Sequence, residues 1–524
     1  MSGAGRHAAR VAAGILVTRV LGYVRERVFA YYFGNGAAAD AFRAALRIPN
    51  ALRNLLGEGT LSASFIPVYA ALNERADKTA ARALAGAVLG LLLLASGVLA
   101  IIGIAFAPGI TALVAQGFAG ERRELTTVLI RILFPMSGLM VVSAWCLGVL
   151  NTHRRFFLPY AAPALWNIAG IAAMVGGAVW FAGEADGPVL TRLALALAWG
   201  TVVGSVLQVI VQLPTCRRLL RGIPLRASLA PEGVRGVLLA WTPLVIGAGV
   251  AQLSGLVDTL LASFTGEGGL ASLGYAQLIQ VLPISLFGAS VAAVALPDLA
   301  RDAAAPADAS RDELRGRLAV GFRRIAFFVV PSAFAFAAAG PAIVGLLFQT
   351  GRFGADDTAL VGGVLAAYGV GLLGHATVKL FASGFYALRD TRTPVRIAVL
   401  SLVVAAGLSW SLMGVLGPAG IALGSSLGGI LNMVLQVTTL ERRVGTILGP
   451  AEWRWLGVAA GGAVIGAALT MLTTGLVDAW GAGPVVGGVA VLAIFGMSYG
   501  ATTLALRHPD AIRGWHTLTG SPAN

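Results

Sequence analysis

Charged residues are scarce in this sequence. Asp, Glu, Lys and Arg make up only 12% of its 524 residues, whereas a typical soluble domain contains about 25%. So few charges could not cover the surface of a water-soluble protein of this length, and 57% of the residues are hydrophobic. Apolar runs of about 20 residues, long enough for a helix to cross a bilayer, recur along the chain. The composition therefore predicts a protein that lies almost entirely in a membrane.

Cysteine and the common catalytic motifs are also rare or missing. The two cysteines, Cys146 and Cys216, are far apart and lack metal-ligand spacing, so neither a disulfide framework nor a zinc site is expected. There is no Gly-rich phosphate loop ending in Lys-Ser/Thr and no His-Glu-x-x-His. Asp356 and Asp357 have no second aspartate cluster, which a magnesium-dependent prenyltransferase would need. We therefore expect no enzyme, no cofactor and no bound metal.

The net charge of +14 could indicate nucleic acid as a partner. However, the basic residues are dispersed among short loops between apolar runs, a pattern that sets membrane topology. The basic first ten residues lead into an apolar stretch, as in a signal peptide, but Arg19, Arg25 and Arg27 interrupt that stretch. We therefore expect no nucleic-acid partner and a first helix that is retained.

Charged and Gly/Pro-rich breaks divide the chain into fourteen apolar spans. They lie near residues 11–33, 38–70, 83–116, 125–150, 158–181, 189–214, 237–264, 271–299, 325–348, 359–388, 397–415, 419–440, 455–477 and 484–506. If the N-terminus is cytoplasmic, 26 of the 38 basic residues fall in cytoplasmic segments and three in the loops opposite. This asymmetry predicts that both termini are in the cytoplasm.

The placement of proline indicates an internal duplication. Three prolines in the first half recur in the second with nearly constant separations of 234, 230 and 235 residues, namely Pro49, Pro67 and Pro159 as Pro283, Pro297 and Pro394. Because six helices return the chain to the same side, the repeats would be parallel. The predicted fold is an all-α polytopic membrane protein with about fourteen transmembrane helices, in two six-helix pseudo-symmetric lobes plus two C-terminal helices. The lobes would span 1–214 and 215–441, the latter with a basic cytoplasmic linker at 215–235. Residues 442–524 would form the last two spans and a cytoplasmic tail.

Charges inside the spans are the strongest functional signal. Each costs about 2.5–3.5 kcal/mol on insertion scales, so such residues usually face a cavity or a partner. They gather in the first two spans, as Arg19, Arg25, Glu26, Arg27, Asp40, Arg43, Arg47, Arg53 and Glu58. Asp40, Arg43 and Arg47 fall within about 60° of one another on an ideal helix. Pro49, Gly57 and Gly59 disturb that helix.

Two interpretations of these arginines remain open. Arg27, Arg43 and Arg47 are placed where long side chains can extend to the membrane interface. Arg19, Arg25 and Arg53 lie deeper and favour a water-filled cavity. Since the planar guanidinium group donates paired hydrogen bonds and stays protonated, it suits a phosphate or pyrophosphate. We therefore hypothesise an anionic substrate.

The later spans contain few charges. His375 and Lys379 lie four residues apart and would share a helix face, but a lone histidine there is more often a packing residue than a ligand. Asp258 is open to three interpretations: a cation site, a pair with a buried arginine, or a hydrogen bond between helices.

Several short motifs resemble a known family, the MurJ (MviN) lipid II flippases. They are 18–26 (TRVLGYVRE), 39–42 (ADAF), 48–50 (IPN), 52–53 (LR), 57–59 (GEG), 65–67 (FIP), 286–288 (LFG), 296–297 (LP) and 385–394 (FYALRDTRTP). They occur in order and cover most of the chain. The resemblance implies the fold of the multidrug/oligosaccharidyl-lipid/polysaccharide (MOP) exporter superfamily, with a central cationic cavity and a groove for a lipid tail formed by the last two helices.

The resemblance also implies functional positions, which are substrate-binding Arg19, Arg25, Arg53, Asp40, Glu58 and Lys379. The chain departs from the family in two places. Relatives commonly have Tyr-Ala-Asp-Arg where this chain has Tyr275-Ala276-Gln277-Leu278, so the cavity arginine expected from the second lobe is absent. The span after Pro394 lacks the Asn and Asp that form a sodium site in some members.

The expected function is a flippase that moves lipid II, the lipid-linked peptidoglycan precursor, from the inner to the outer leaflet by alternating access. Two alternatives share the fold: a flippase for another polyprenyl-linked glycan, and a cation-coupled multidrug exporter. A non-transporting scaffold would leave the buried charges without a purpose. Expected partners are the polyprenyl-pyrophosphate-linked disaccharide-peptide and membrane lipids, with wall-synthesis or division proteins as candidates at the cytoplasmic loops. We expect a monomer.

Overall fold

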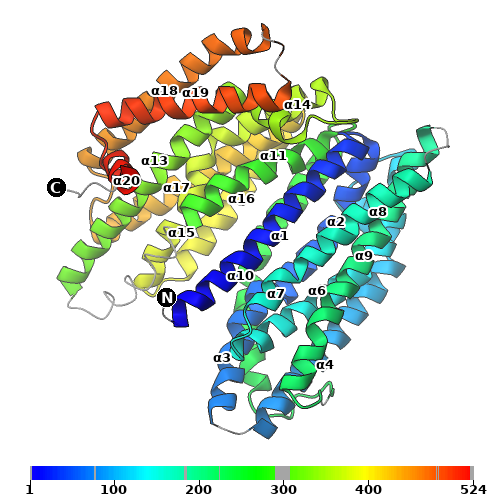
Figure 1. Ribbon diagram of the computed structural model, residues 1–524. Helices are drawn as coiled ribbons and strands as arrows, with labels where there is room; N and C mark the ends of the chain where they lie inside the picture. Colours follow the sequence, from blue (N-terminus) through cyan, green and yellow to red (C-terminus); the bar gives the residue numbers. More distant parts are fainter. Residues whose placement is uncertain are drawn as a thin grey trace. The chain divides into compact units, whose positions relative to one another are not determined.

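The computed structural model describes residues 3–75, 78–181, 186–223, 225–289, 307–479, 481 and 483–519. These residues are almost entirely helical (Figure 1). The chain divides into two compact units. Unit 1 comprises Met1–Gly268 with Thr350–Arg352, and unit 2 comprises Gly269–Gln349 with Phe353–Asn524.

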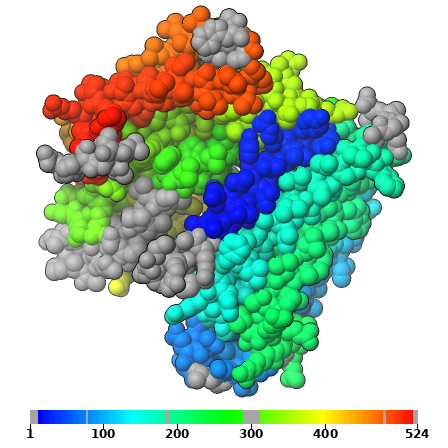
Figure 2. Space-filling view, in the orientation of Figure 1, coloured from blue at the N-terminus to red at the C-terminus, as the bar shows by residue number. Residues whose placement is uncertain are grey.

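Unit 1 contains the first ten helices. They are α1 (Gly3–Phe33), α2 (Ala37–Leu56), α3 (Glu58–Glu74), α4 (Lys78–Ala105), α5 (Ala107–Val114), α6 (Gly120–Thr152), α7 (Phe157–Ala161), α8 (Pro163–Trp180), α9 (Asp186–Leu219) and α10 (Val234–Ala262). α1 packs along α7 and α8, while α6 packs against α2, α4 and α9. Apolar side chains of α3, α4, α6, α9 and α10 form its core. Figure 2 shows α1 as a long blue strip at the surface, in keeping with exposed Leu16 and Val20.

The second span is broken in the middle, as its glycines suggested. α2 ends at Leu56, Gly57 has φ −110° and ψ −111°, and Gly59 has φ +24°. A Cβ atom on Gly57 would lie 2.6 Å from the carbonyl oxygen of Arg53, so only glycine fits this close turn. The break puts Arg53 in the last turn of α2, where the helix dipole favours a cation.

The compact unit extends beyond the expected boundary between repeats at 214/215. Helix α10 packs on α2 and α3, and therefore belongs to unit 1 by its contacts. The boundary between the two sequence repeats at 214/215 is a separate matter from the compact units, and it stays a prediction.

The two cysteines meet within this unit. Both are free and buried, and the thiol of Cys216 lies 3.8 Å from the carbonyl oxygen of Cys146.

Unit 2 contains the remaining helices. They are α11 (Gly269–Pro283), the π-helix η1 (Ile284–Ala289), α13 (Ala307–Phe348), α14 (Ala355–Val370), α15 (Leu372–Ala387), α16 (Arg392–Leu416), α17 (Pro418–Val444), α18 (Pro450–Ala479), α19 (Pro484–Ala505) and α20 (Pro509–Thr519). α16 pairs with α17, and α18 and α19 pair with each other and both pack on α13 (Figure 1). Gly371 lies between α14 and α15, at a place where the chain packs closely against α17. A Cβ atom there would lie 2.4 Å from the Cα of Ser426, so only glycine fits.

Within the described residues, twelve helices are long and apolar enough to cross a membrane, and the α14–α15 pair, bent by 41°, brings the number to as many as thirteen. α1 is not among them. Its 31 residues span about 46 Å, but they include Arg19, Arg25, Glu26 and Arg27. The structure is therefore consistent with the predicted fourteen spans, and the charges of α1 explain why it fails a test of apolarity.

The turns after α6 and α15 share one backbone pattern, which also follows α9 at Arg221 and α19 at Arg507. After α6, the N–H groups of Arg154 and Arg155 donate to the carbonyls of Asn151 and Leu150. After α15, the N–H groups of Arg389 and Asp390 donate to those of Tyr386 and Phe385. Arg154 and Arg389 have φ of 58° and 57°, a left-handed conformation that costs a non-glycine residue roughly 1–2 kcal/mol. The two turns correspond residue for residue, at the separation already seen between Pro159 and Pro394.

Candidate functional site

Three intramembrane charges of α1 and α2 form one cluster. The carboxylate of Glu26 accepts hydrogen bonds from Arg25 and, at 3.0 Å, from Arg43. The three side chains are only 12% to 20% exposed. Glu26 therefore joins α1 to α2 by neutralising one of two guanidinium groups, and the cluster keeps a net positive charge.

Aromatic rings complete the surroundings of the cluster. The guanidinium of Arg25 lies 4.2 Å from the centre of the Trp166 ring of α8, and that of Arg43 lies 5.2 Å from the Phe29 ring. Cation–π contacts of this kind stabilise a cation removed from water. An adjacent cavity of about 30 Å³, lined in part by Thr201, has room for one or two water molecules. It is too small for a substrate headgroup.

Arg19 and Arg53 differ from Arg25 in having no acidic partner. Arg19 of α1 is exposed, and neither residue forms an ion pair within the described part of the chain. Arg53 is half-buried, and its Nε atom is buried without a hydrogen-bond partner. A buried guanidinium donor without an acceptor is costly, so it marks a place where an anion or water belongs.

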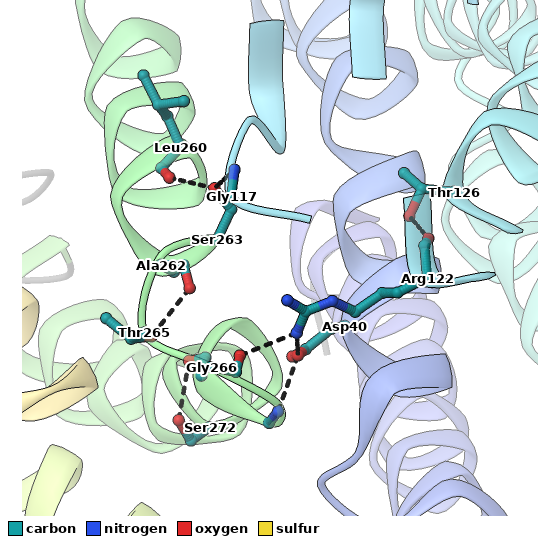
Figure 3. A network of polar contacts seen from close by, with 12 residues as sticks. Asp40, Gly117, Arg122, Thr126, Leu260, Ala262, Ser263, Thr265, Gly266 and Ser272 are labelled. Atoms are coloured by element: carbon teal, nitrogen blue, oxygen red, sulfur yellow. Dashed lines mark hydrogen bonds and ion pairs between the residues drawn. The ribbon is translucent and has the colours of Figure 1, made fainter. Parts of the chain in front are cut away.

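Asp40 is held by other parts of unit 1 (Figure 3). Its side chain is fully buried, and its Oδ2 accepts from Arg122 Nη1 at 3.2 Å and from the Gly268 N–H at 2.8 Å. Arg122 also donates to the carbonyl of Gly266 at 2.9 Å. A second link lies nearby, where the Gly117 N–H donates to the Ser263 hydroxyl. Asp40 thus ties the start of α2 to the start of α6 and to the segment after α10.

Arg47 lies between α2 and α10. A Cβ atom on Gly255 would be 1.1 Å from Arg47 Nη2, so the guanidinium occupies the space left by that glycine. Arg47 is also the positive charge that acts on Asp258, three residues along α10. About two turns further along α2, Asn54 donates to Gln252 at 3.4 Å. Of the three interpretations of Asp258, this electrostatic interaction favours pairing with a buried arginine.

The other residues singled out from the sequence lie outside these contacts of α1 and α2. Lys379 is exposed on α15 in unit 2, while His375 is packed against Gly429 of α17, with its Nε2 buried. The side chain of Glu58 lies outside the described residues. At the position of the missing second-lobe arginine, Leu278 is 41% exposed, and the neighbouring Gln277 donates to the Tyr368 hydroxyl at 3.0 Å.

Unit 2 also contains an apolar pocket of about 520 Å³. Its walls come from α13, α19 and α20, and include Phe328, Phe495 and Trp515. α18 contributes none of the lining residues, so of the last two spans only α19 borders it. An apolar pocket of this size suits a hydrocarbon chain.

Sequence reasoning missed the partners that fix these charges. The interface hypothesis was wrong for Arg43, which pairs with Glu26. Arg122 was counted only as an outer-loop charge, although it holds Asp40. Trp166 gave no signal because an aromatic residue in an apolar run is ordinary. These pairings depend on how helices are rotated against each other, which a single sequence does not specify.

Long apolar helices, two pseudo-symmetric lobes and buried arginines define a multi-pass membrane transport protein. Solved structures with this fold include a lipid II flippase MurJ in an inward closed conformation, with a TM-score of 0.77, 22% identity, and coverage of 95% of this chain and 98% of that chain. An inward-facing multidrug resistance MATE family transporter of the MOP superfamily has a TM-score of 0.64, 18% identity, and coverage of 84% and 98%.

Sequence relatives identify the family. The family model described as lipid II flippase MurJ matches residues 29–489. A Burkholderia cenocepacia protein named lipid II flippase MurJ is 37% identical over 435 residues, 82% of each chain. A Haemophilus influenzae protein named probable lipid II flippase MurJ is 32% identical over 440 residues, 82% of this chain and 84% of that protein. The chain belongs to the MurJ family of lipid II flippases, as its motifs predicted.

Proposed function

We propose that this chain moves lipid II from the inner to the outer leaflet of the bacterial cytoplasmic membrane by alternating access. Family membership gives the substrate class. The observation that carries the chemistry is the set of arginines on α1 and α2. Among the described residues Arg19 and Arg53 have no acidic partner, and Arg25 shares Glu26 with Arg43. A pyrophosphate would supply the negatively charged partner for these guanidinium groups.

Arg19 and Arg53 are the proposed direct contacts of the pyrophosphate. Arg19 is exposed, so it can meet the headgroup without rearrangement, and the unpartnered Nε of Arg53 is a ready donor. Arg25 is held by Glu26 and Trp166, which preorganises its guanidinium. We propose Lys379, from the second lobe, as a further contact of the pyrophosphate, and Glu58 as an acceptor for hydroxyl groups of the sugar headgroup.

Asp40 has an indirect part in this proposal. Its carboxylate has no exposed surface and already accepts from Arg122 and Gly268. An anionic substrate gains nothing from a buried carboxylate. Asp40 therefore acts by holding the segment after α10 in place.

The polyprenyl tail is proposed to stay in apolar surroundings while the headgroup crosses. The pocket bordered by α13, α19 and α20 supports this, because aromatic and aliphatic side chains form nearly all of its surface. Both termini are proposed to be cytoplasmic, on the charge asymmetry of the loops. The working unit is proposed to be a monomer, whose cytoplasmic loops offer contacts to wall-synthesis or division proteins.

The test is complementation in a bacterium depleted of its own MurJ-family protein. The wild-type chain should restore growth and prevent lipid II from accumulating in the inner leaflet. Arg19→Ala and Arg53→Ala should accumulate lipid II at normal protein levels. Arg123→Ala is the matched control, because Arg123 is an exposed arginine in the first turn of α6, beside Arg122, and it should behave like the wild type.

Two results would contradict the proposal. Full activity of both Arg19→Ala and Arg53→Ala would remove the electrostatic argument, since neither guanidinium would then be needed. Accumulation of a different lipid-linked glycan on depletion, with lipid II unchanged, would show that another polyprenyl-linked molecule is the substrate.

A further inference from the structure

A second cationic pocket lies at the turn between α6 and α7 in unit 1. Its volume is about 830 Å³, and it is lined by His153, Arg154, Arg155, Phe156, Phe157, Leu158 and Thr215. This is the end of unit 1 that the charge asymmetry assigns to the cytoplasmic side. It is separate from the Arg25 cluster, with which it shares no lining residue.

The charge of this pocket is not balanced by the protein. Both Arg154 and Arg155 are exposed, and neither forms an ion pair within the described residues. No acidic side chain is among the lining residues. His153 is fixed by the Tyr69 hydroxyl at 2.9 Å, and burial lowers its pKa, so the positive charge comes from the two arginines.

The corresponding turn of unit 2 shows how such a turn is neutralised. There Asp390 takes the position of Arg155, and its carboxylate accepts from the Arg392 and Thr393 N–H groups and from Arg443 Nη1 at 2.7 Å. These bonds, with that of the Thr393 hydroxyl, hold the pKa of Asp390 well below its usual range. The same backbone turn therefore holds a resident carboxylate in one repeat and an extra guanidinium in the other.

An apolar surface adjoins the cations of unit 1. Phe157 is 49% exposed and lines the pocket beside Leu158. Two cations next to exposed apolar side chains at a membrane interface match a phospholipid, whose phosphate and acyl chain lie one above the other. A soluble phosphate would use only half of this surface.

We propose that the α6–α7 pocket binds an anionic phospholipid, with its phosphate between Arg154 and Arg155 and an acyl chain along Phe157. The phosphate takes the place that the Asp390 carboxylate holds in the other repeat. The lipid stays bound as a structural partner of the turn and is not the transported molecule. This assignment is independent of the proposed transport function.

The experiment measures lipid binding to the purified full-length protein by native mass spectrometry, with phosphatidylglycerol and phosphatidylcholine of identical acyl chains. The wild type should retain phosphatidylglycerol in preference to phosphatidylcholine. Arg155→Asp installs the residue that unit 2 has at this position and should weaken phosphatidylglycerol binding about 30-fold, since each basic residue near the membrane surface contributes about 1 kcal/mol. Arg154→Gln combined with Arg155→Gln, which lowers the net charge by the same two units without adding an acid, should weaken it similarly.

Arg392→Asp is the matched control, because it makes the same change in net charge at the exposed surface of the other turn. Its effect should stay below about fivefold. Equal binding by wild type and Arg155→Asp, or equal binding of both lipids, would overturn the proposal. Inorganic phosphate should not compete at the lipid's concentration, and complete displacement by it would overturn the lipid assignment in favour of a soluble phosphate.

Discussion

Replacing Glu26 by Gln should destabilise unit 1 strongly. Glu26 is the shared acceptor of Arg25 and Arg43, and all three side chains are at least four-fifths buried. Removing one partner of a buried ion pair costs about 3–5 kcal/mol because the other charge is left uncompensated. The amide oxygen of Gln can still accept one hydrogen bond, so we expect about 2–3 kcal/mol. The free energy of unfolding, measured by SDS titration in mixed micelles, checks this value.

A double-mutant cycle isolates the interaction. Arg43→Gln alone leaves Glu26 paired with Arg25, and should cost about 1 kcal/mol. The double variant leaves one fewer unpaired cation than Glu26→Gln, so the coupling energy should be at least about 1 kcal/mol. The exposed pair of Glu313 and Arg317 on α13 provides the control, with coupling below about 0.5 kcal/mol. Additivity of Glu26→Gln and Arg43→Gln within 0.5 kcal/mol would refute the reasoning.

Three further predictions use contacts elsewhere in the fold. Gly255→Ala should destabilise unit 1 by about 1–3 kcal/mol because it displaces Arg47. Gly247→Ala, also on α10 but with open space around it, should raise the free energy of unfolding by up to about 1 kcal/mol. Equal effects of the two substitutions on that free energy would contradict the packing of Arg47 against Gly255. Asp40→Asn should lower the free energy of unfolding by about 2 kcal/mol, whereas the control Arg123→Gln should lower it by less than about 0.5 kcal/mol. An unchanged free energy in Asp40→Asn would show that Asp40 does not hold the segment after α10. His508 is buried against Phe327 and Trp455, and burial lowers its pKa. The undocked form therefore binds protons more readily, and docking of α20 should weaken as the pH falls through about 6.5 and be complete above it. Hydrogen exchange of 509–519 at pH 5.5 and 7.5 measures this, and His508→Phe should abolish the difference.

The membrane architecture was readable from the sequence because it follows from composition and helix length. An apolar run of about 20 residues forms a helix in a bilayer, so the presence and order of these spans needed no knowledge of packing. The break in the second span was equally local, since Gly57 and Gly59 permit a backbone that other residues do not. The constant separation of Pro159 and Pro394 agrees with the equal spacing of the two turns after α6 and α15.

The partners of the charged residues could not be predicted in the same way. Helical periodicity placed Asp40, Arg43 and Arg47 on one face of α2, which was correct as geometry. That face meets α1 at Arg43, α10 at Arg47 and the start of α6 at Asp40. A stripe about 60° wide thus touches three different neighbours, and only tertiary packing decides which residue meets which.

The distribution of uncompensated charge separates two kinds of anion site. At Asp40 and Asp390 the protein supplies its own carboxylate, and the local structure is closed around it. At Arg19 and Arg53 no acid is present within the described residues, although an arginine inside a span costs about 2.5–3.5 kcal/mol on insertion scales. A bound pyrophosphate offsets that cost only while it is present, which suits an anion that must leave. The proposed lipid site places Arg154 and Arg155 at the membrane interface. There a charged side chain has a low free-energy cost, and phospholipid phosphates are always available. A resident lipid therefore fits the turn, and a transient headgroup fits the interior of the spans.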